Sequence, residues 1–207
     1  MRSTPAALCG AVLLLTVAAP AARAEPINWS YSWSNSPTNV TSDSDPGSYV
    51  HLTNEKLTKA VNSSDIVATN LTTFSQADPD HPAQFTHRTY KLTLTLIDQD
   101  SNKSATVTFA GEFNGRLTSL SSNLSNTFLG ATSFSVVLGK HRYVVTMDSY
   151  SPPGPPGAHN AGSIAAHADI NVGLVNTPEP ASLTLLVLGV ALVSFAPRGR
   201  RRSRSPA

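Results

Sequence analysis

The sequence contains almost no cysteine, and its central part is poor in several residues that favour helices. Its one cysteine, Cys9, lies in an apolar N-terminal stretch. The rest of the chain can therefore form no internal disulfide and needs an ordinary apolar core. Lysine, glutamate and methionine are scarce between residues 25 and 180, whereas threonine, serine, asparagine and valine are abundant. This composition disfavours a helical domain and favours β-strands.

Familiar catalytic motifs are also missing. The sequence has no G-x-S-x-G, H-E-x-x-H or H-x-x-x-H pattern, so neither a serine hydrolase nor a zinc site is indicated. Glu112 is the only glutamate in a predicted strand region, and no second carboxylate is indicated opposite it, as a glycosidase requires. We therefore expect no enzymatic activity, and a secreted hydrolase is the last alternative. The six histidines are expected to be solvated or hydrogen-bonded: His51, His81, His87, His141, His159 and His167.

Positive charge is concentrated at the two ends of the chain. All thirteen acidic residues lie between Glu25 and Glu179, whereas seven of the fifteen basic ones lie outside that range. The central part therefore carries thirteen negative against eight positive charges, a net charge of −5. An acidic domain of this kind gives no reason to expect a nucleic-acid partner.

The N-terminal residues have the pattern of a signal peptide. Arg2 supplies a positive start, residues 6–19 are apolar, and Ala22-Arg23-Ala24 fits the small-residue rule for cleavage. We predict that residues 1–24 are removed after Ala24 and that the mature chain starts at Glu25.

The C-terminal residues combine a short motif, an apolar run and a basic end. Pro178-Glu179-Pro180 precedes 16 uncharged residues, 181–196. As a helix this run is roughly 24 Å long, slightly short of a ~30 Å hydrocarbon core, and flanking side chains can compensate. The two prolines keep Glu179 in extended chain. The basic end favours the cytoplasmic side of a membrane, and its arginines are Arg198, Arg200, Arg201, Arg202 and Arg204.

Residues 176–207 therefore resemble the PEP-CTERM sorting signal of exported bacterial proteins. The resemblance implies that a membrane-embedded exosortase cuts near Pro178-Glu179-Pro180 and releases the mature chain. It implies an inner-membrane-anchored precursor, then a cell-surface or extracellular location, and a link with exopolysaccharide and biofilm. An uncut C-terminal membrane anchor is the alternative.

Residues 25–175 are predicted to form one domain of about eight strands. Apolar and polar residues alternate in several segments, with turn residues between them. Residues 98–103 and 139–141 are expected to close hairpins, 151–157 to form a proline-rich connection, and 54–60 to form a helical turn. We predict an antiparallel β-sandwich, with a closed β-barrel as the alternative. The expected strands are 27–33, 48–52, 65–74, 90–97, 105–110, 133–138, 142–147 and 163–175.

Two groups of residues are candidate binding sites. Trp29, Tyr31 and Trp33 share one face of the first strand, which predicts either core packing or a platform for carbohydrate. Asp98, Asp100 and Asn102 have the D-x-D-x-N spacing that opens a calcium loop, but the following glycine and the distant glutamate are missing. We expect no other cofactor. The sequence favours a structural or interaction protein of the cell surface or extracellular matrix, with a carbohydrate-binding module as the alternative.

Overall fold

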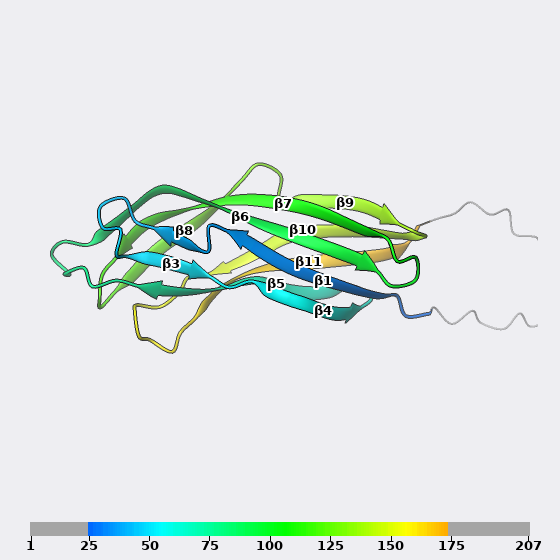
Figure 1. Ribbon diagram of the computed structural model, residues 1–207, viewed down its shortest axis with the longest axis horizontal. Coiled ribbons are helices and arrows are strands. Elements are labelled where there is room, and N and C mark those ends of the chain that lie inside the picture. Colours follow the sequence, from blue (N-terminus) through cyan, green and yellow to red (C-terminus); the bar gives the residue numbers. More distant parts are fainter. Residues whose placement is uncertain (1–24, 174–207) are drawn as a thin grey trace, which may run out of the picture.

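The computed structural model describes residues 25–173, which form a sandwich of two antiparallel sheets (Figure 1). One sheet has the strand order β4-β1-β6-β7-β8 and the other β2-β3-β5-β11-β10-β9. The predicted β-sandwich is confirmed. The strands are β1 (Asn28–Ser36), β2 (Asn39–Thr41), β3 (Tyr49–Leu52), β4 (Glu55–Val61), β5 (Ser64–Phe74), β6 (Ala83–Asp98), β7 (Ser104–Leu117), β8 (Ser122–Leu129), β9 (Ser133–Leu138), β10 (His141–Ser151) and β11 (Gly162–Val172).

Large aromatic side chains fill the space between the sheets. Trp29 and Trp33 of β1 are buried, and the Trp29 ring meets the Tyr143 ring of the opposite sheet edge-on at 6.1 Å. Phe113 and Tyr150 make a second contact between the sheets, with ring centroids 6.2 Å apart. Burying one such side chain removes roughly 150–250 Å² from water, which contributes roughly 4–6 kcal/mol before entropy is counted. An apolar core therefore holds the domain, as the lack of cysteine predicts.

The two predicted hairpins are confirmed; β9 has the predicted bounds, and the other three strands are longer than expected. The β6–β7 pair runs from Ala83 opposite Leu117 to Ile97 opposite Ser104. The β9–β10 pair closes where Leu138 faces His141. The strand β7 continues past residue 110 because its second half pairs with β8, a neighbour that the pattern of β7 alone does not reveal.

The predicted helical turn at 54–60 is wrong. Residues 55–61 form the edge strand β4, whose Lys59 lies opposite Ser30 of β1. Pairing with β1 supplies backbone hydrogen bonds that outweigh the weak helical preference of this segment. The strands β2 and β8 have no predicted counterpart either, so with β4 the described residues contain three strands more than the eight expected, eleven in all.

The sandwich is elongated, and both ends of the described chain leave it at the same end (Figure 1). The β6–β7 and β9–β10 turns lie at this end too; we call it the terminal end. The loops 42–48 and 75–82 lie at the opposite end, which we call the distal end. Residues 25–173 include no helix long and apolar enough to cross a membrane.

Candidate functional site

Two turns meet at the terminal end and bring a set of polar side chains together. The β9–β10 turn is Gly139-Lys140, and Gly139 has φ +62°. A two-residue hairpin of the II′ type needs such a glycine at its first central position. A Cβ atom at Gly139 would lie 2.6 Å from Cβ of Ser101 in the β6–β7 turn. Glycine thus allows the two turns to pack closely, with Asp98 and His141 beside them.

Asp98 is fully buried and accepts four hydrogen bonds. Its Oδ1 accepts from the backbone N–H and the hydroxyl of Ser101, at 2.7 and 2.9 Å. Its Oδ2 accepts from Nδ1 of His141 at 2.5 Å and from the Tyr143 hydroxyl at 2.8 Å. Burial alone would raise the pKa of Asp98, but the hydrogen bonds outweigh burial and lower this pKa to about 2. An ionised carboxylate can only accept, so Nδ1 of His141 carries the hydrogen.

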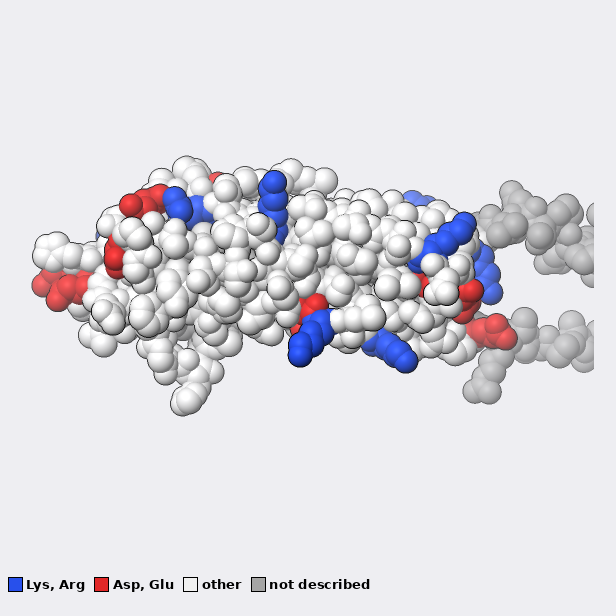
Figure 2. Space-filling model, viewed as in Figure 1, with Lys and Arg blue, Asp and Glu red and all other residues white. Residues whose placement is uncertain are grey.

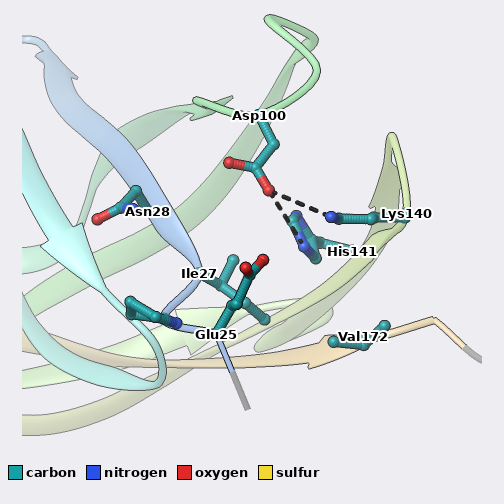
Figure 3. A pocket seen from close by; sticks show the side chains of 8 residues that line it. Glu25, Ile27, Asn28, Asp100, Lys140, His141 and Val172 are labelled. Carbon is teal, nitrogen blue, oxygen red and sulfur yellow. Dashed lines mark ion pairs between the residues drawn. The ribbon is translucent and has the colours of Figure 1, made fainter. Parts of the chain in front are cut away.

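A pocket of about 480 Å³ lies next to this buried group. Figure 3 shows Glu25, Asp100, Lys140 and His141 around the pocket, with Val172 at its side. Asp100 Oδ2 lies 3.6 Å from Nζ of Lys140 and 3.8 Å from Nε2 of His141. The pocket therefore carries charges of both signs above the buried Asp98–His141 pair.

The arrangement resembles two members of a Ser-His-Asp triad, but the hydroxyls are placed differently. A triad needs a hydroxyl aligned with Nε2 of the histidine. The hydroxyls of Ser101 and Tyr143 both donate to Asp98 instead. Burial and the hydrogen bond to Asp98 also raise the pKa of Tyr143, which keeps this hydroxyl protonated. The geometry is that of a fixed polar anchor that ties the β6–β7 turn to β10.

The predicted calcium residues are placed around His141 rather than around a common point. Asp98 bonds to Nδ1 of His141, whereas Asp100 faces Nε2 on the other side of the ring. Asn102 is exposed and has φ +57°, as a turn residue of this type tolerates. Within residues 25–173, no group of three or more His, Cys, Asp or Glu side chains is arranged to hold a metal ion. Calcium binding at these residues stays a prediction.

The predicted aromatic platform of β1 lies inside the protein. Trp29, Tyr31 and Trp33 are all buried, so these rings cannot stack on a sugar. A different aromatic pair faces solvent on the six-stranded sheet. Tyr49 of β3 lies directly opposite Phe74 of β5, and their rings are 5.2 Å apart and nearly parallel at 18°.

This second pair borders a shallow pocket of about 470 Å³. Phe74 is 43% exposed. Beside it, Thr72 lies opposite His51, and Nδ1 of His51 lies 2.7 Å from Oδ1 of Asn39. We call Asn39, Tyr49, His51, Thr72 and Phe74 the aromatic patch. It combines an apolar ring face with polar groups at its side, the combination that pyranose rings require.

Glu112, the predicted lone glutamate, pairs with a histidine in a β-bulge. The register of β6 against β7 shifts between Phe85 and Arg88, and His87 there has φ +53°. Nδ1 of His87 lies 3.0 Å from both carboxylate oxygens of Glu112, and Asn114 donates to Oε1. The hydrogen bonds from His87 and Asn114 lower the pKa of Glu112. This hydrogen-bonded pair fixes the bulge on the outer face of the five-stranded sheet.

The other histidines take separate places. His167 of β11 bonds to Asp65 of β5 at 2.6 Å on the outer face of the six-stranded sheet, and this hydrogen bond raises the pKa of His167. His81 lies in the distal loop 75–82, and His159 lies in the loop after β10; both are exposed.

The predicted targeting residues lie outside residues 25–173. These are Ala22 and Ala24 of the signal cleavage site, Pro178, Glu179 and Pro180 of the processing motif, the apolar run 181–196, and the arginines from Arg198 to Arg204.

Sequence reasoning missed the partners of Asp98 and the aromatic patch. The sequence pattern places His141 in a turn and predicts only that it is solvated or hydrogen-bonded, without naming a partner, and it predicts Tyr143 only as a strand residue. Their meeting with Asp98 depends on how two hairpins dock, which no local pattern records. For Tyr49 and Phe74 a local signal did exist, since each is a lone aromatic at the end of a predicted strand.

Neither family models, nor curated proteins, nor solved structures yield a match to this chain.

Proposed function

We propose that this chain is an exported bacterial protein, sorted through its PEP-CTERM-like tail, with a structural or interaction role at the cell surface or in the extracellular matrix. The observation that carries the proposal is the position of the two chain ends. Both leave the sandwich at the terminal end. Membrane-bound enzymes can therefore reach the signals at both chain ends from the same side of the folded domain.

Chain length supports the same arrangement. Six residues lead from Val172 at the end of β11 to Pro178. They reach at most about 20 Å, so a domain held by the tail stands close to the membrane. The longest strand, β6, has 16 residues and spans roughly 50 Å. In this arrangement the distal end points away from the membrane, where it meets other molecules.

The partner implied at the membrane is an exosortase-type enzyme that cuts near Pro178-Glu179-Pro180. The described domain supports a release model because its core is complete without the tail. Residues 25–173 contain both sheets and the buried cluster that joins them. A cut after residue 177 therefore leaves all eleven strands described for residues 25–173 in place.

A second candidate function is carbohydrate binding through the aromatic patch. The exposed ring of Phe74 and the polar side chains of His51 and Thr72 favour it. The patch lies on the part of β5 farthest from Ser64, which pairs near the terminal end. A tethered domain would thus present the patch away from the membrane, toward exopolysaccharide.

The proposal is tested by the intact mass of the protein in each fraction of the native host. We expect a released form that starts at Glu25 and ends between Pro178 and Ala181. The variant Glu179→Ala should keep its tail and stay with the membranes, while Glu55→Ala, a matched glutamate change inside the domain, should be processed normally. A wild-type mass that always extends to Ala207 and occurs only in membranes would make the tail a plain anchor and overturn the sorting proposal.

A further inference from the structure

One side of the sandwich is formed by a stretch of chain without any charge. From Leu117 to Gly139 there are 23 residues, and none is Asp, Glu, Lys or Arg. This stretch contains β8 and β9, each of which is the last strand of its sheet. The strand β8 covers the distal half of β7, and β9 covers the half of β10 nearest the terminal end. Figure 2 shows large uncharged areas on the face in view.

The other two edges of the sheets are protected against pairing. Proteins protect edge strands with charged side chains or by keeping them very short. The edge strand β4 carries Glu55, Lys56 and Lys59. The edge strand β2 has three residues. The strand β8 is uncharged, but its sequence SNLSNTFL contains two asparagines, a residue that is depleted in strands.

The strand β9 lacks these protections. Its sequence SFSVVL has strong strand formers and neither charge, proline nor glycine. Val137 exposes 62% of its surface, although it lies in the middle of an apolar run. Within residues 25–173, β9 pairs only with β10. Because ladder hydrogen bonds alternate, half of its backbone N–H and C=O groups point away from β10.

We propose that β9 is an interface through which two copies of this chain pair edge to edge as antiparallel strands. A two-fold axis perpendicular to the sheet keeps the core-facing side chains of both copies on the same side. A register centred on Val136 places Phe134 opposite Leu138 of the second copy, so apolar residues meet on the core-facing side, while Ser135 lies opposite Val137 on the outer side. The two six-stranded sheets then become one continuous sheet.

A second copy fits this edge better than a strand of another kind. An isologous pair brings each side chain of β9 against one from the same set, and this set contains only Ser, Phe, Val and Leu. The strand β9 itself then leaves no charge facing an apolar side chain, a contact that costs free energy. The guanidinium of Arg142 on β10 is bound to the Ser135 hydroxyl on the outer face. A surface or matrix protein also meets its own copies at high local concentration. The pairing does not depend on the proposed sorting route.

The experiment uses the full-length chain in detergent solution, so that membrane attachment does not limit how copies meet. In a Cys9→Ala background, Val137→Cys on β9 is compared with Leu57→Cys on β4. The two native side chains are almost equally exposed, at 62% and 63%, and both lie on edge strands. A short bismaleimide is added, and dimers are measured on denaturing gels and by mass. We expect several-fold more dimer for Val137→Cys than for Leu57→Cys.

A second pair of variants tests whether the edge itself is responsible. In a Ser135→Cys chain, Val137→Lys should strongly reduce cross-linking, because a charge would then face the uncharged edge of the second copy. Leu57→Lys in the same chain should leave cross-linking unchanged. Equal cross-linking at positions 137 and 57, or no cross-linking at 137 while a monofunctional maleimide labels that cysteine fully, would overturn the proposal.

Discussion

At the scale of single residues, Asp98 connects the two hairpins of the terminal end. It is the only fully buried acidic residue among residues 25–173, and its four hydrogen bonds reach both hairpins. The β6–β7 turn supplies Ser101, and β10 supplies His141 and Tyr143. Replacing the carboxylate by an amide puts an NH₂ group against donors, which leaves buried polar groups without partners.

We therefore predict that Asp98→Asn lowers the free energy of unfolding at pH 7 by about 3 kcal/mol. The difference should shrink in acid. The pKa of Asp98 is about 2 in the folded chain and near 3.8 when unfolded, so between these pH values the unfolded state binds the additional proton. The ionised Asp98 carboxylate therefore contributes about 2 kcal/mol to the free energy of unfolding of the wild type above pH 4, and this contribution is lost as the pH falls toward 2.

Urea unfolding of wild type and Asp98→Asn at pH 7 and at pH 2.5 measures how far the difference in their free energies of unfolding decreases in acid. Asp148→Asn, on the same strand as His141 but exposed, controls for the change in net charge and should alter stability by less than about 0.5 kcal/mol. If the difference in the free energy of unfolding between wild type and Asp98→Asn is the same at both pH values, the hydrogen bonds assigned to Asp98 are contradicted.

The sequence identified some residues of this site but not their role. The spacing of Asp98 and Asp100 resembles that of a calcium loop, and the structure places them on either side of His141. Their neighbours come from a hairpin about 40 residues away. Such a contact depends on the packing of the two sheets, so a spacing rule that reads only local sequence does not reveal it.

At the scale of elements, prediction succeeded where alternation was strong. The segments 90–97 and 105–110 lie in β6 and β7, because one of their faces is buried and the other is polar. Prediction failed at β4 and β8, which are edge strands. Both strands bury few apolar side chains, so their apolar alternation is weak, and pairing with β1 or β7 decides their conformation.

The aromatic patch on β3 and β5 gives a prediction at the same scale. We expect Phe74→Ala to weaken binding to a soluble β-glucan or to exopolysaccharide from the host by about 5- to 30-fold, since loss of one stacking ring costs about 1–2 kcal/mol. Affinity electrophoresis in gels that contain the polysaccharide measures the effect.

The matched control for this patch is Val67→Ala. Val67 is 41% exposed, against 43% for Phe74, and lies on the same strand. It lies outside the aromatic patch, so its loss should leave migration unchanged. If wild-type protein and both variants migrate equally in gels with and without polysaccharide, the patch is an ordinary cross-strand pair and the carbohydrate function is withdrawn.

At the scale of the whole molecule, the directions of the strands connect the two proposals. The strand β9 runs from the middle of the sandwich toward the terminal end, where it turns into β10. In an antiparallel β9–β9 pair, the terminal ends of the two copies point in opposite directions. Copies held in one membrane by their tails all point the same way. Pairing through β9 should therefore follow release from the membrane.

This gives a prediction about processing and assembly together. In intact cells, Val137→Cys chains that also carry Glu179→Ala should keep their tails and form little cross-linked dimer, whereas released Val137→Cys protein should cross-link readily. Solubilising the tail-bearing variant in detergent should restore its cross-linking, which shows that orientation and not folding was limiting. Equal cross-linking of anchored and released chains would mean that copies pair in the same direction, and the antiparallel arrangement would have to be abandoned.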